Sequence, residues 1–347
     1  MNRFCFLVFV GSVACARYVE TEEPVSVPRV RIVATERGPG GGRLVTLDES
    51  GVRTGNLTTF GAEVAVDTHP SFTADGSLIA FASSRGRKSV EKTHLWLVEA
   101  ALGKTPVQLT RGPAVDRDPV WAGGRLYYAS NAGGTFDIWA LRFARKDGQI
   151  VPAGRPQQLT TGKGDELSPS PSPDGKKLVY MARDTETGTA RLEVLTLEEG
   201  TVKALTKGPA DLTPAWSPDG KKIAFSGPVR GRNDTDIYWV DAKGGEPQLF
   251  VDESYADQTA PVWSPSGRYI FATSVYRSVS TGRPVLSSIV AADVNKKKWH
   301  ALHDPTAVDS RWGVGLTGEV SGKITQNTLY VSALRRAIEQ QLNQHAR

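Results

Sequence analysis

Short runs of alternating apolar and polar residues recur along this chain, and a turn of the Pro-Asp-Gly kind separates the two runs of each pair. The clearest copy is TPAWSPDGKKIAFSG at 213–227, where Ile223 and Phe225 alternate with smaller or polar residues after the turn. A period of two predicts β-strands. The turn joins them into a hairpin, because proline presets φ, aspartate caps its own turn and glycine accepts a positive φ. Further copies occur at 69–83, 118–130, 168–182 and 260–274.

Each hairpin is followed by two more predicted strands, so the repeating unit has four. The third strands are predicted at 94–100, 137–143, 191–197, 236–242 and 288–294. The fourth strands end on a repeated leucine, at Leu57, Leu109, Leu159, Leu205, Leu249 and Leu302. The prolines near the start of the hairpins recur roughly every 45 to 50 residues, a spacing typical of four-stranded propeller blades.

The six strand ends predict six blades, one more than the number of hairpins. The first blade then takes three strands from 29–35, 42–48 and 52–58, and its innermost strand from 309–316 near the far end of the chain. Closing the ring in this way removes the open sheet edges of a linear array. The sequence therefore predicts an all-β fold: a six-bladed β-propeller of four-stranded antiparallel blades over residues 29–316, closed by a C-terminal strand.

The best-formed repeat, D-x-x-P-x-W-S-P-D-G, resembles the WD-like repeat of TolB-type β-propellers. The matching residues are Asp211, Pro214, Trp216, Ser217, Pro218, Asp219 and Gly220. The copy at 165–209 departs from the pattern, with Pro171 in place of the tryptophan. The resemblance implies the propeller fold, and it implies binding of peptide segments of envelope partners over the channel mouth. The same repeat occurs in propellers attached to prolyl-oligopeptidase-like peptidases, so fold is better indicated than function.

Residues 1–14 have the pattern of a secretory signal peptide. Arg3 is followed by the apolar run 4–10 and then by small residues. The run is too short to cross a bilayer as a helix, which needs about 20 apolar residues. The signal predicts export from the cytoplasm.

The residues at the end of this signal resemble a bacterial lipobox. Cleavage before Cys15 in the sequence SVAC would leave that cysteine at the new N-terminus carrying lipid. Serine stands where leucine is usual, and ordinary signal cleavage after Ala14 or Ala16 is the alternative. Residues 15–28 are polar and contain prolines, so they are interpreted as a tether between the anchor and the propeller.

Residues 317–347 form a C-terminal extension of a different character. Between 328 and 344, apolar residues recur at steps of four, which predicts an amphipathic helix. These residues are Tyr330, Leu334, Ile338 and Leu342. Packing against the propeller and docking to a partner are both compatible with such a stripe.

Composition narrows the possible partners and cofactors. The net charge is +5, but the basic residues are spread over many loops instead of forming a helix or an aromatic-flanked groove, so nucleic acid is not expected. The only cysteines are Cys5 and Cys15, which excludes a disulfide or a thiolate metal site inside the propeller. We predict no cofactor or metal, with an axial cation left open, and a monomer that meets the membrane only through its lipid.

An acidic residue stands just before each predicted innermost strand. These residues are Asp67, Asp116, Glu166, Asp211, Asp257 and Asp309. Innermost strands line the channel, so the carboxylates are predicted at the channel mouth, together with His69. Such a ring has two interpretations: a site for a cation or an amine, and a set of caps that hold each blade's own loop.

The loops between second and third strands lie on the same face and carry arginine. The predicted rim consists of Arg37, Arg85, Arg87, Arg183, Arg230, Arg232, Arg277 and Arg283. Guanidinium groups bind carboxylates and phosphates through paired donors, so an acidic peptide or an acidic glycan is a sensible guest. The alternative is that these loops are simply solvated.

No catalytic motif accompanies these features. The chain has no G-x-S-x-G elbow, and the segment after residue 316 is too short for an α/β-hydrolase domain. We therefore predict a non-catalytic binding module for an envelope protein or peptide, exported and lipid-anchored in the periplasm or at the outer membrane. The competing hypothesis is a carbohydrate-active lyase or hydrolase in which Asp67, His69, Asp116 and Asp211 meet at the axis.

Overall fold

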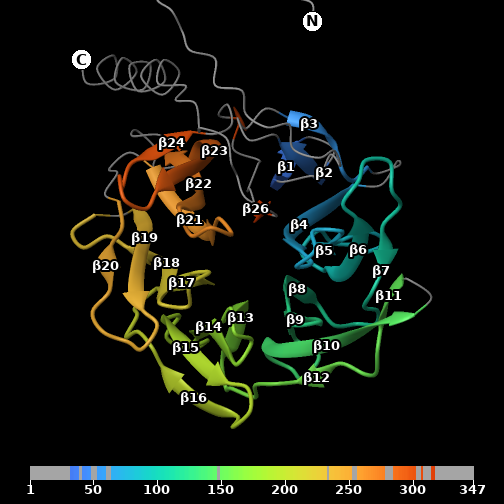
Figure 1. Ribbon diagram of the computed structural model, residues 1–347, viewed down its shortest axis with the longest axis horizontal. Coiled ribbons are helices and arrows are strands. Elements are labelled where there is room, and N and C mark those ends of the chain that lie inside the picture. The colour runs from blue at the N-terminus through green and yellow to red at the C-terminus, as the bar shows by residue number, and fades with distance from the viewer. Residues whose placement is uncertain are drawn as a thin grey trace, which may run out of the picture.

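The computed structural model describes residues 32–38, 41–47, 53–59, 64–146, 149–232, 234–251, 256–277, 284–301, 306–307 and 314–316. Within these ranges every regular element is a β-strand, and the strands form small sheets arranged around a central axis (Figure 1). The predicted all-β, propeller-like arrangement is therefore confirmed. The signal, the tether, the C-terminal helix, Cys15, Arg283 and Asp309 lie outside the described residues. No helix among the described residues has the length and apolar character needed to cross a membrane.

Four of the sheets are single antiparallel blades with four or five strands. The first has β8 (Asp116–Ala122), β9 (Arg125–Ser130), β10 (Asp137–Lys146), β11 (Gln149–Pro152) and β12 (Gln157–Gln158). The second has β13 (Asp165–Pro171), β14 (Lys177–Arg183), β15 (Ala190–Thr196) and β16 (Thr201–Ala204). The third has β17 (Leu212–Trp216), β18 (Lys222–Pro228), β19 (Thr235–Asp241) and β20 (Gln248–Leu249). The fourth has β21 (Ala256–Trp263), β22 (Tyr269–Arg277), β23 (Pro284–Asp293), β24 (Trp299–Ala301) and β25 (Thr306–Ala307).

The remaining eight strands form one larger sheet. Its strands are β1 (Ile32–Gly38), β2 (Gly41–Leu47), β3 (Arg53–Asn56), β4 (Ala65–Phe72), β5 (Leu78–Ser83), β6 (His94–Glu99), β7 (Val107–Gln108) and β26 (Val314–Leu316). Strand β26 pairs antiparallel with β1, with Ile32 opposite Leu316. This is the neighbour expected for the closing strand, and it joins the far end of the chain to the first strand.

A short parallel contact joins β2 to β4 inside this sheet. It consists of two residue pairs, Gly41 with Ala65 and Gly42 with Val66. Gly41 has φ +109°, and a Cβ at this position would lie 2.1 Å from the carbonyl oxygen of Ala65. Glycine is required here both by the backbone conformation and by the close approach of the two strands.

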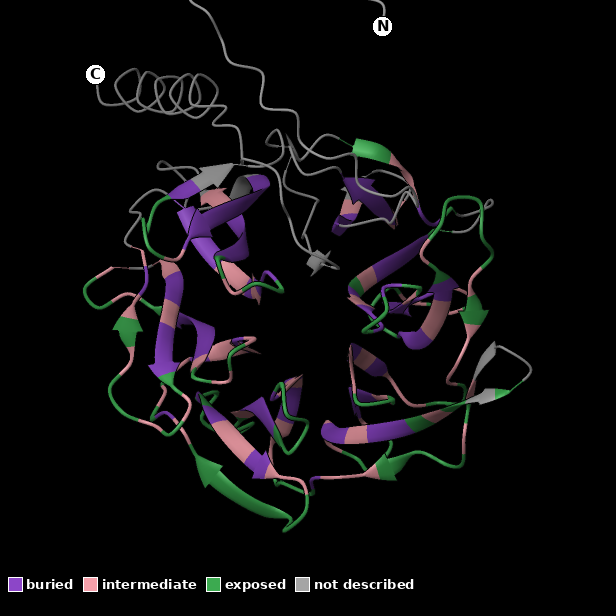
Figure 2. Cartoon of the chain, viewed as in Figure 1, coloured by how far each residue is buried: buried purple, intermediate pink, exposed green. Residues whose placement is uncertain are grey.

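The hydrophobic core lies between neighbouring sheets, and the middle strands are buried on both faces (Figure 2). Alternate residues of β5 belong to different clusters: Ile79 and Phe81 pack with Leu44, whereas Ala80 and Ala82 pack with Leu126 and Tyr128. Six such clusters are found among the described residues. One of them joins Ile32 and Val45 to Phe271 and Ile289, so the first and last sheets pack together. Two-sided burial explains why these strands contain nearly continuous apolar runs.

Each innermost strand with a repeated proline contains a bulge at that point. The pairing register shifts in the middle of β4, β8, β13, β17 and β21. The residue before each proline has a φ near +50°, and these residues are His69, Asp118, Ser168, Thr213 and Ala260. Proline has no N–H for the ladder and is tolerated in sheets at edges and bulges. The bulge therefore accommodates the proline and re-aims the side chain that precedes it.

Candidate functional site

The five described acids of the predicted channel mouth are buried. The exposed fractions are 0% for Asp67, 4% for Asp116, 6% for Glu166, 7% for Asp211 and 4% for Asp257. Each stands in or directly before an innermost strand, as the sequence predicted. Each also has a hydrogen-bond partner from a loop or from the neighbouring sheet, so the group does not form an open ring of carboxylates. This arrangement supports the capping interpretation for the described members of the set.

Asp67 is held by an arginine of the predicted rim. Arg85 donates from Nη2 to Oδ2 at 2.6 Å and from Nε to Oδ1 at 3.3 Å. Burial raises the pKa of Asp67, while the charge and hydrogen bonds of Arg85 act in the opposite direction. Arg85 is also largely buried, with 13% of its side chain exposed. It therefore neutralises an interior carboxylate and is not available on the rim.

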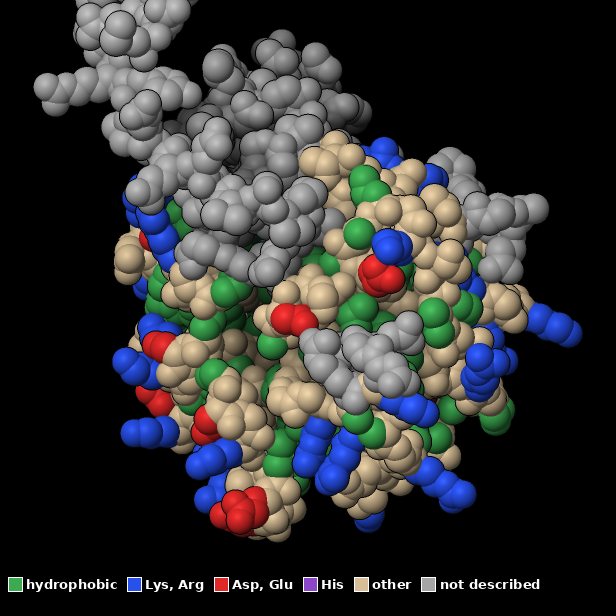
Figure 3. All heavy atoms as spheres, turned by 45° about the vertical axis from the view of Figure 1, so that its right-hand side comes forward, with side chains coloured by type: hydrophobic (Ala, Val, Ile, Leu, Met, Phe, Trp, Pro, Cys, Tyr) green, Lys and Arg blue, Asp and Glu red, His purple; other side chains and the backbone are tan. Residues whose placement is uncertain are grey.

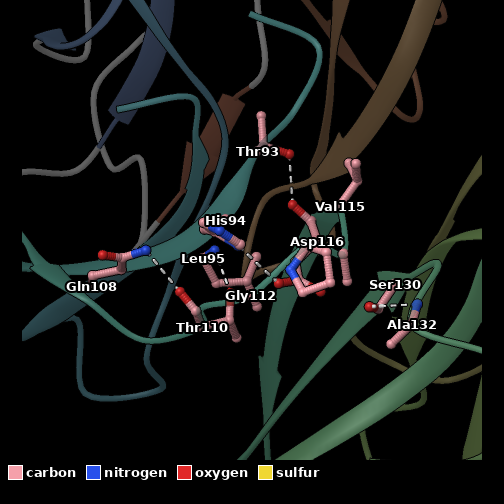
Figure 4. Close-up of polar contacts among 12 residues, drawn as sticks. Thr93, His94, Leu95, Gln108, Thr110, Gly112, Val115, Asp116, Ser130 and Ala132 are labelled. Atoms are coloured by element: carbon pink, nitrogen blue, oxygen red, sulfur yellow. Dashed lines mark hydrogen bonds and ion pairs between the residues drawn. The ribbon is translucent and has the colours of Figure 1, made fainter. Parts of the chain in front are cut away.

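Asp116 is held by a histidine from the preceding blade (Figure 4). His94 on β6 places Nδ1 3.3 Å from Oδ2 of Asp116, and the hydroxyl of Thr93 donates to the Asp116 carbonyl at 2.6 Å. Arg87 contacts Nε2 of His94 at 2.7 Å and donates to the carbonyl oxygen of Gly112 at 2.7 Å. A second predicted rim arginine is therefore also part of the internal structure.

Threonines at the ends of the fourth strands connect the acids to the backbone. Their hydroxyl oxygens accept hydrogen bonds from backbone N–H groups of the adjacent strand at 2.8 to 2.9 Å: Thr58 from Leu44, Thr110 from Leu95, Thr160 from Ile138 and Thr206 from Leu192. The hydroxyls of Thr58, Thr160 and Thr206 in turn bond the carboxylates of Asp67, Glu166 and Asp211. The repeated Leu-Thr pair of the sequence thus has a structural explanation.

The other rim arginines divide between internal and exposed positions. Arg232 contacts Asp234 at 3.0 Å and Asp236 at 2.9 Å. Arg183 and Arg230 are exposed. Arg37 and Arg277 lie in β1 and β22, and their side chains are not among those described. Figure 3 shows Lys and Arg side chains dispersed over one face instead of gathered into a single patch.

A polar cluster that the sequence reading did not anticipate lies on the bulges of β4, β8 and β13. Nε2 of His69 lies 3.4 Å from Oδ1 of Asp118, and Nε of Arg117 lies 3.2 Å from the same atom. Ser168 donates to Oδ2 of Asp118 from its backbone nitrogen at 3.0 Å and its hydroxyl at 3.1 Å. Asp118 is 6% exposed. We call His69, Arg117, Asp118 and Ser168 the axial cluster.

Asp118 is ionised in this cluster. Burial alone would raise the pKa of Asp118, but the charges of His69 and Arg117 and the bonds from Arg117 and Ser168 hold it below its ordinary value. The side chains of His69 and Arg117 are 45% and 41% exposed, so both reach solvent. The one signal in the sequence was positional, because His69, Asp118 and Ser168 all precede a repeated proline.

The acids required by the catalytic alternative do not meet. Asp67, Asp116 and Asp211 are each buried with separate partners, and His69 contacts Asp118 instead. Among the described residues, no group of three or more His, Cys, Asp or Glu side chains is arranged to hold a metal ion. The axial cluster offers exposed donors around one buried carboxylate, an arrangement suited to recognising acceptor groups on another molecule.

Comparison with known proteins agrees with this architecture. The family model described as "TolB beta propeller domain" matches residues 139–301. The Tol-Pal system protein TolB of Francisella tularensis subsp. holarctica is 25% identical over 254 residues, covering 71% of this chain and 55% of the relative. The chain thus resembles TolB-type β-propellers. It spans about half the length of the curated relatives it matches.

Solved structures of TolB proteins show the same fold as this chain. TolB from Acinetobacter baumannii superposes with a TM-score of 0.60 at 18% identity, covering 78% of this chain and 62% of that chain. A TolB-related structure from Agrobacterium tumefaciens gives a TM-score of 0.58 at 19% identity, covering 80% and 90%. At such identities the likeness concerns the fold alone. The Francisella tularensis relatives are named for the Tol-Pal system, and a relative from Chlorobium chlorochromatii is named a TolB homolog.

Proposed function

We propose that this TolB-type propeller is an exported module that binds a protein or peptide of the bacterial cell envelope and catalyses no reaction. The observation that carries the proposal is the axial cluster, in which a buried Asp118 fixes two exposed donors, His69 and Arg117, on the innermost strands. Because both side chains are partly exposed to solvent and can carry positive charge, an acidic peptide segment is the ligand they fit best, with an acidic glycan as the second class.

The similarity to TolB supports an envelope partner. The Francisella tularensis relatives are named Tol-Pal system protein TolB, and 71% of this chain aligns with the first of them. The exposed rim residues Arg183 and Arg230 extend the basic surface that would face the same ligand. The buried acids Asp67, Asp116, Glu166, Asp211 and Asp257 then act as internal supports of this face and not as its contact residues.

The full ring in this proposal has six blades over residues 29–316. The eight-stranded sheet divides naturally at the parallel β2–β4 contact, because two residue pairs join its halves while the strands within each half are antiparallel. The six hydrophobic clusters correspond to six contacts between neighbouring blades, one of them between the first and last sheets. Closure by 309–316 would hold the axial cluster in a fixed frame.

Export and anchoring form a separate part of the proposal. Residues 1–14 direct secretion, Cys15 carries lipid, residues 15–28 act as a tether, and the C-terminal helix belongs to the extension at 317–347. The mature protein is then a monomer held at the periplasmic side of the envelope. Labelling of a producing cell with a fatty-acid analogue, with Cys15→Ser as control, tests the anchor: label should appear on the native chain and not on the variant.

Binding is tested by site-specific photo-crosslinking in the intact envelope. A photoreactive amino acid at Arg117 or Arg230 should capture a defined protein, and a probe at Lys203 on the outer strand β16 should not. A charge-reversed chain, Arg117→Glu with Arg230→Glu, should lose at least about ten-fold of the captured partner, equivalent to about 1.4 kcal/mol of binding energy. Lys203→Glu reverses a single charge at an exposed site on the outer strand and should leave capture unchanged.

Two results would overturn this assignment. Equal capture by the charge-reversed chain and the Lys203→Glu control would remove the axial face from the interface. Turnover of a glycan or peptide by the purified chain, lost in His69→Ala, would instead establish catalysis at that face.

A further inference from the structure

Two acidic side chains face each other where β10 meets β13. Asp137 begins β10 and Glu166 is the second residue of β13, and they are 2% and 6% exposed. The two carboxyl groups are hydrogen-bonded to each other, and both accept from the backbone N–H of Gly162. Asp137 Oδ1 and Glu166 Oε2 are buried, and no donor among the described residues reaches either oxygen. We call this contact the β10–β13 joint.

A single proton would satisfy both of these oxygens. Two ionised carboxylates in a buried contact repel each other strongly, whereas a carboxylic acid donates to a carboxylate. We propose that the β10–β13 joint holds one shared proton, carried by Glu166 and donated to Asp137, and that loss of this proton to solvent loosens the joint and the pocket beside it. This inference does not depend on the proposed binding function.

The equivalent contacts elsewhere in the ring do not pair two acids. His94 lies against Asp116 between β6 and β8. Between β19 and β21, the Gln258 amide can donate to Asp236 and the Thr235 N–H donates to Asp257. Between β15 and β17, the small residues Ala190 and Ala210 meet. Among these described contacts, only the β10–β13 joint requires an added proton to become complementary.

The surroundings of the joint favour the protonated form. Burial, helped by the charge and hydrogen bond of Asp137, raises the pKa of Glu166 to about 7, although the bonds from Thr160 and Gly162 act in the opposite direction. Burial also raises the pKa of Asp137. The other charged or titratable groups around the joint are Asp165, Tyr180, Glu193, Arg191, Arg183, Lys163, Asp184, Glu186 and Lys207.

The joint forms part of the wall of a pocket on the loop-bearing face. The pocket has a volume of about 460 Å³ and is lined by Glu166, the loop 162–165, the β14–β15 loop and Lys207. Two hydrogen bonds tie this wall to the neighbouring sheet: Glu166 N–H to the Phe136 carbonyl at 2.6 Å, and Phe136 N–H to Asp165 Oδ1 at 3.2 Å. A second negative charge in the joint would weaken these bonds and change the pocket wall.

The direct test is a titration of the full chain labelled with ¹³C at the glutamate carboxyl carbons. One resonance should titrate with a midpoint near pH 7, and it should be missing from Glu166→Gln. If no glutamate resonance titrates above about pH 5.5, near the ordinary range for this side chain, the shared proton does not exist. Asp137→Asn is the second variant, in which the Glu166 midpoint should fall toward its ordinary value because the negative neighbour is gone.

Hydrogen exchange reports whether the proton also controls the wall. After correction for intrinsic rates, the Phe136 and Glu166 amides should exchange about ten-fold faster at pH 8.5 than at pH 6, a ratio equivalent to one unit of pKa. Glu166→Gln, whose amide supplies a permanent donor, should give equal protection at both pH values. Glu186→Gln makes the same change at an exposed position of the pocket and should retain the native response. Equal protection of the native chain at both pH values would refute the proposed loosening.

Discussion

Replacement of Arg85 by methionine is expected to destabilise the propeller strongly at neutral pH. Methionine keeps much of the aliphatic length but removes both hydrogen bonds to Asp67, at 2.6 and 3.3 Å. The carboxylate, which is fully buried, is then left without its charged partner. Breaking a buried pair in this way typically costs about 3 to 5 kcal/mol, because the remaining charge cannot be solvated. We expect Arg85→Met to lower the free energy of unfolding by about 3 kcal/mol or more.

The pH dependence of this loss follows from the protonation of Asp67. Burial already raises the pKa of Asp67, and removal of Arg85 raises it further. The charge penalty in Arg85→Met is therefore present above the raised pKa of the variant and diminishes as the pH falls through it, when Asp67 takes up a proton. The difference between native and variant stability should thus be smaller at pH 4.5 than at pH 7.5.

Urea unfolding followed by tryptophan fluorescence provides the assay, since the chain has eight tryptophans. Arg191→Met is the matched control: its ion pair with Glu193 is 2.6 Å long but its side chain is 55% exposed, so its loss should cost less than about 1 kcal/mol. In the double variant Asp67→Asn with Arg85→Met, at least half of the lost stability should return. Equal effects of Arg85→Met and Arg191→Met would refute the assignment of Arg85 as an internal partner.

Three further outcomes are expected. Gly41→Ala should lower the melting temperature more than Gly200→Ala. Both glycines have a positive φ, which costs an alanine about 1 kcal/mol or more, but of the two only Gly41 would place a Cβ against a carbonyl oxygen. Equal shifts in melting temperature would contradict the close approach of the two strands. Thr206→Val should cost about 1 to 3 kcal/mol in urea unfolding, because the Leu192 N–H loses its acceptor; an unchanged midpoint would argue against this role. The native free energy of unfolding should decrease by up to about 3 kcal/mol between pH 4.5 and 8, because the pKa of Glu166 is raised from its ordinary value to about 7 in the folded chain. The stabilisation is fully present below the ordinary pKa and is lost as the pH rises through 7. Glu166→Gln should flatten this curve.

The strands were predictable because their signals are local. The alternation in 213–227 and its Pro-Asp-Gly turn locate the ends of both strands of a hairpin to within a few residues. The structure has β17 and β18 at these positions. The place of β26 beside β1 was also anticipated, because three strands lacked a fourth, but the sequence predicted a separate four-stranded blade and not one eight-stranded sheet that includes β4 to β7. The extension of β10 to Lys146 and its hairpin with β11 were missed, since no comparable turn signal marks them.

The side-chain partners were less accessible to sequence reasoning. Asp118 and Ser168 are 50 residues apart, and Asp67 and Arg85 are 18 apart, so their contacts depend on how neighbouring blades and loops meet. The described acids lie in or directly before the innermost strands, as the repeat indicated, but whether such an acid faces an open channel or a blade interface depends on packing. His69 was predicted at the channel mouth, but its partners Asp118 and Ser168 were missed because they lie on bulges of separate strands and the repeated proline was interpreted only as a strand marker.

The alternation of clusters along the middle strands determines which positions are energetically coupled. Ile79 and Ala80 are adjacent in sequence but pack toward opposite neighbours, so their substitutions should have nearly additive effects on stability. Leu44 and Phe81 are distant in sequence but occupy one cluster, and double substitutions there should show clear interaction energies. Thermodynamic coupling in this chain is therefore expected to follow the circumference of the molecule more closely than the order of its residues.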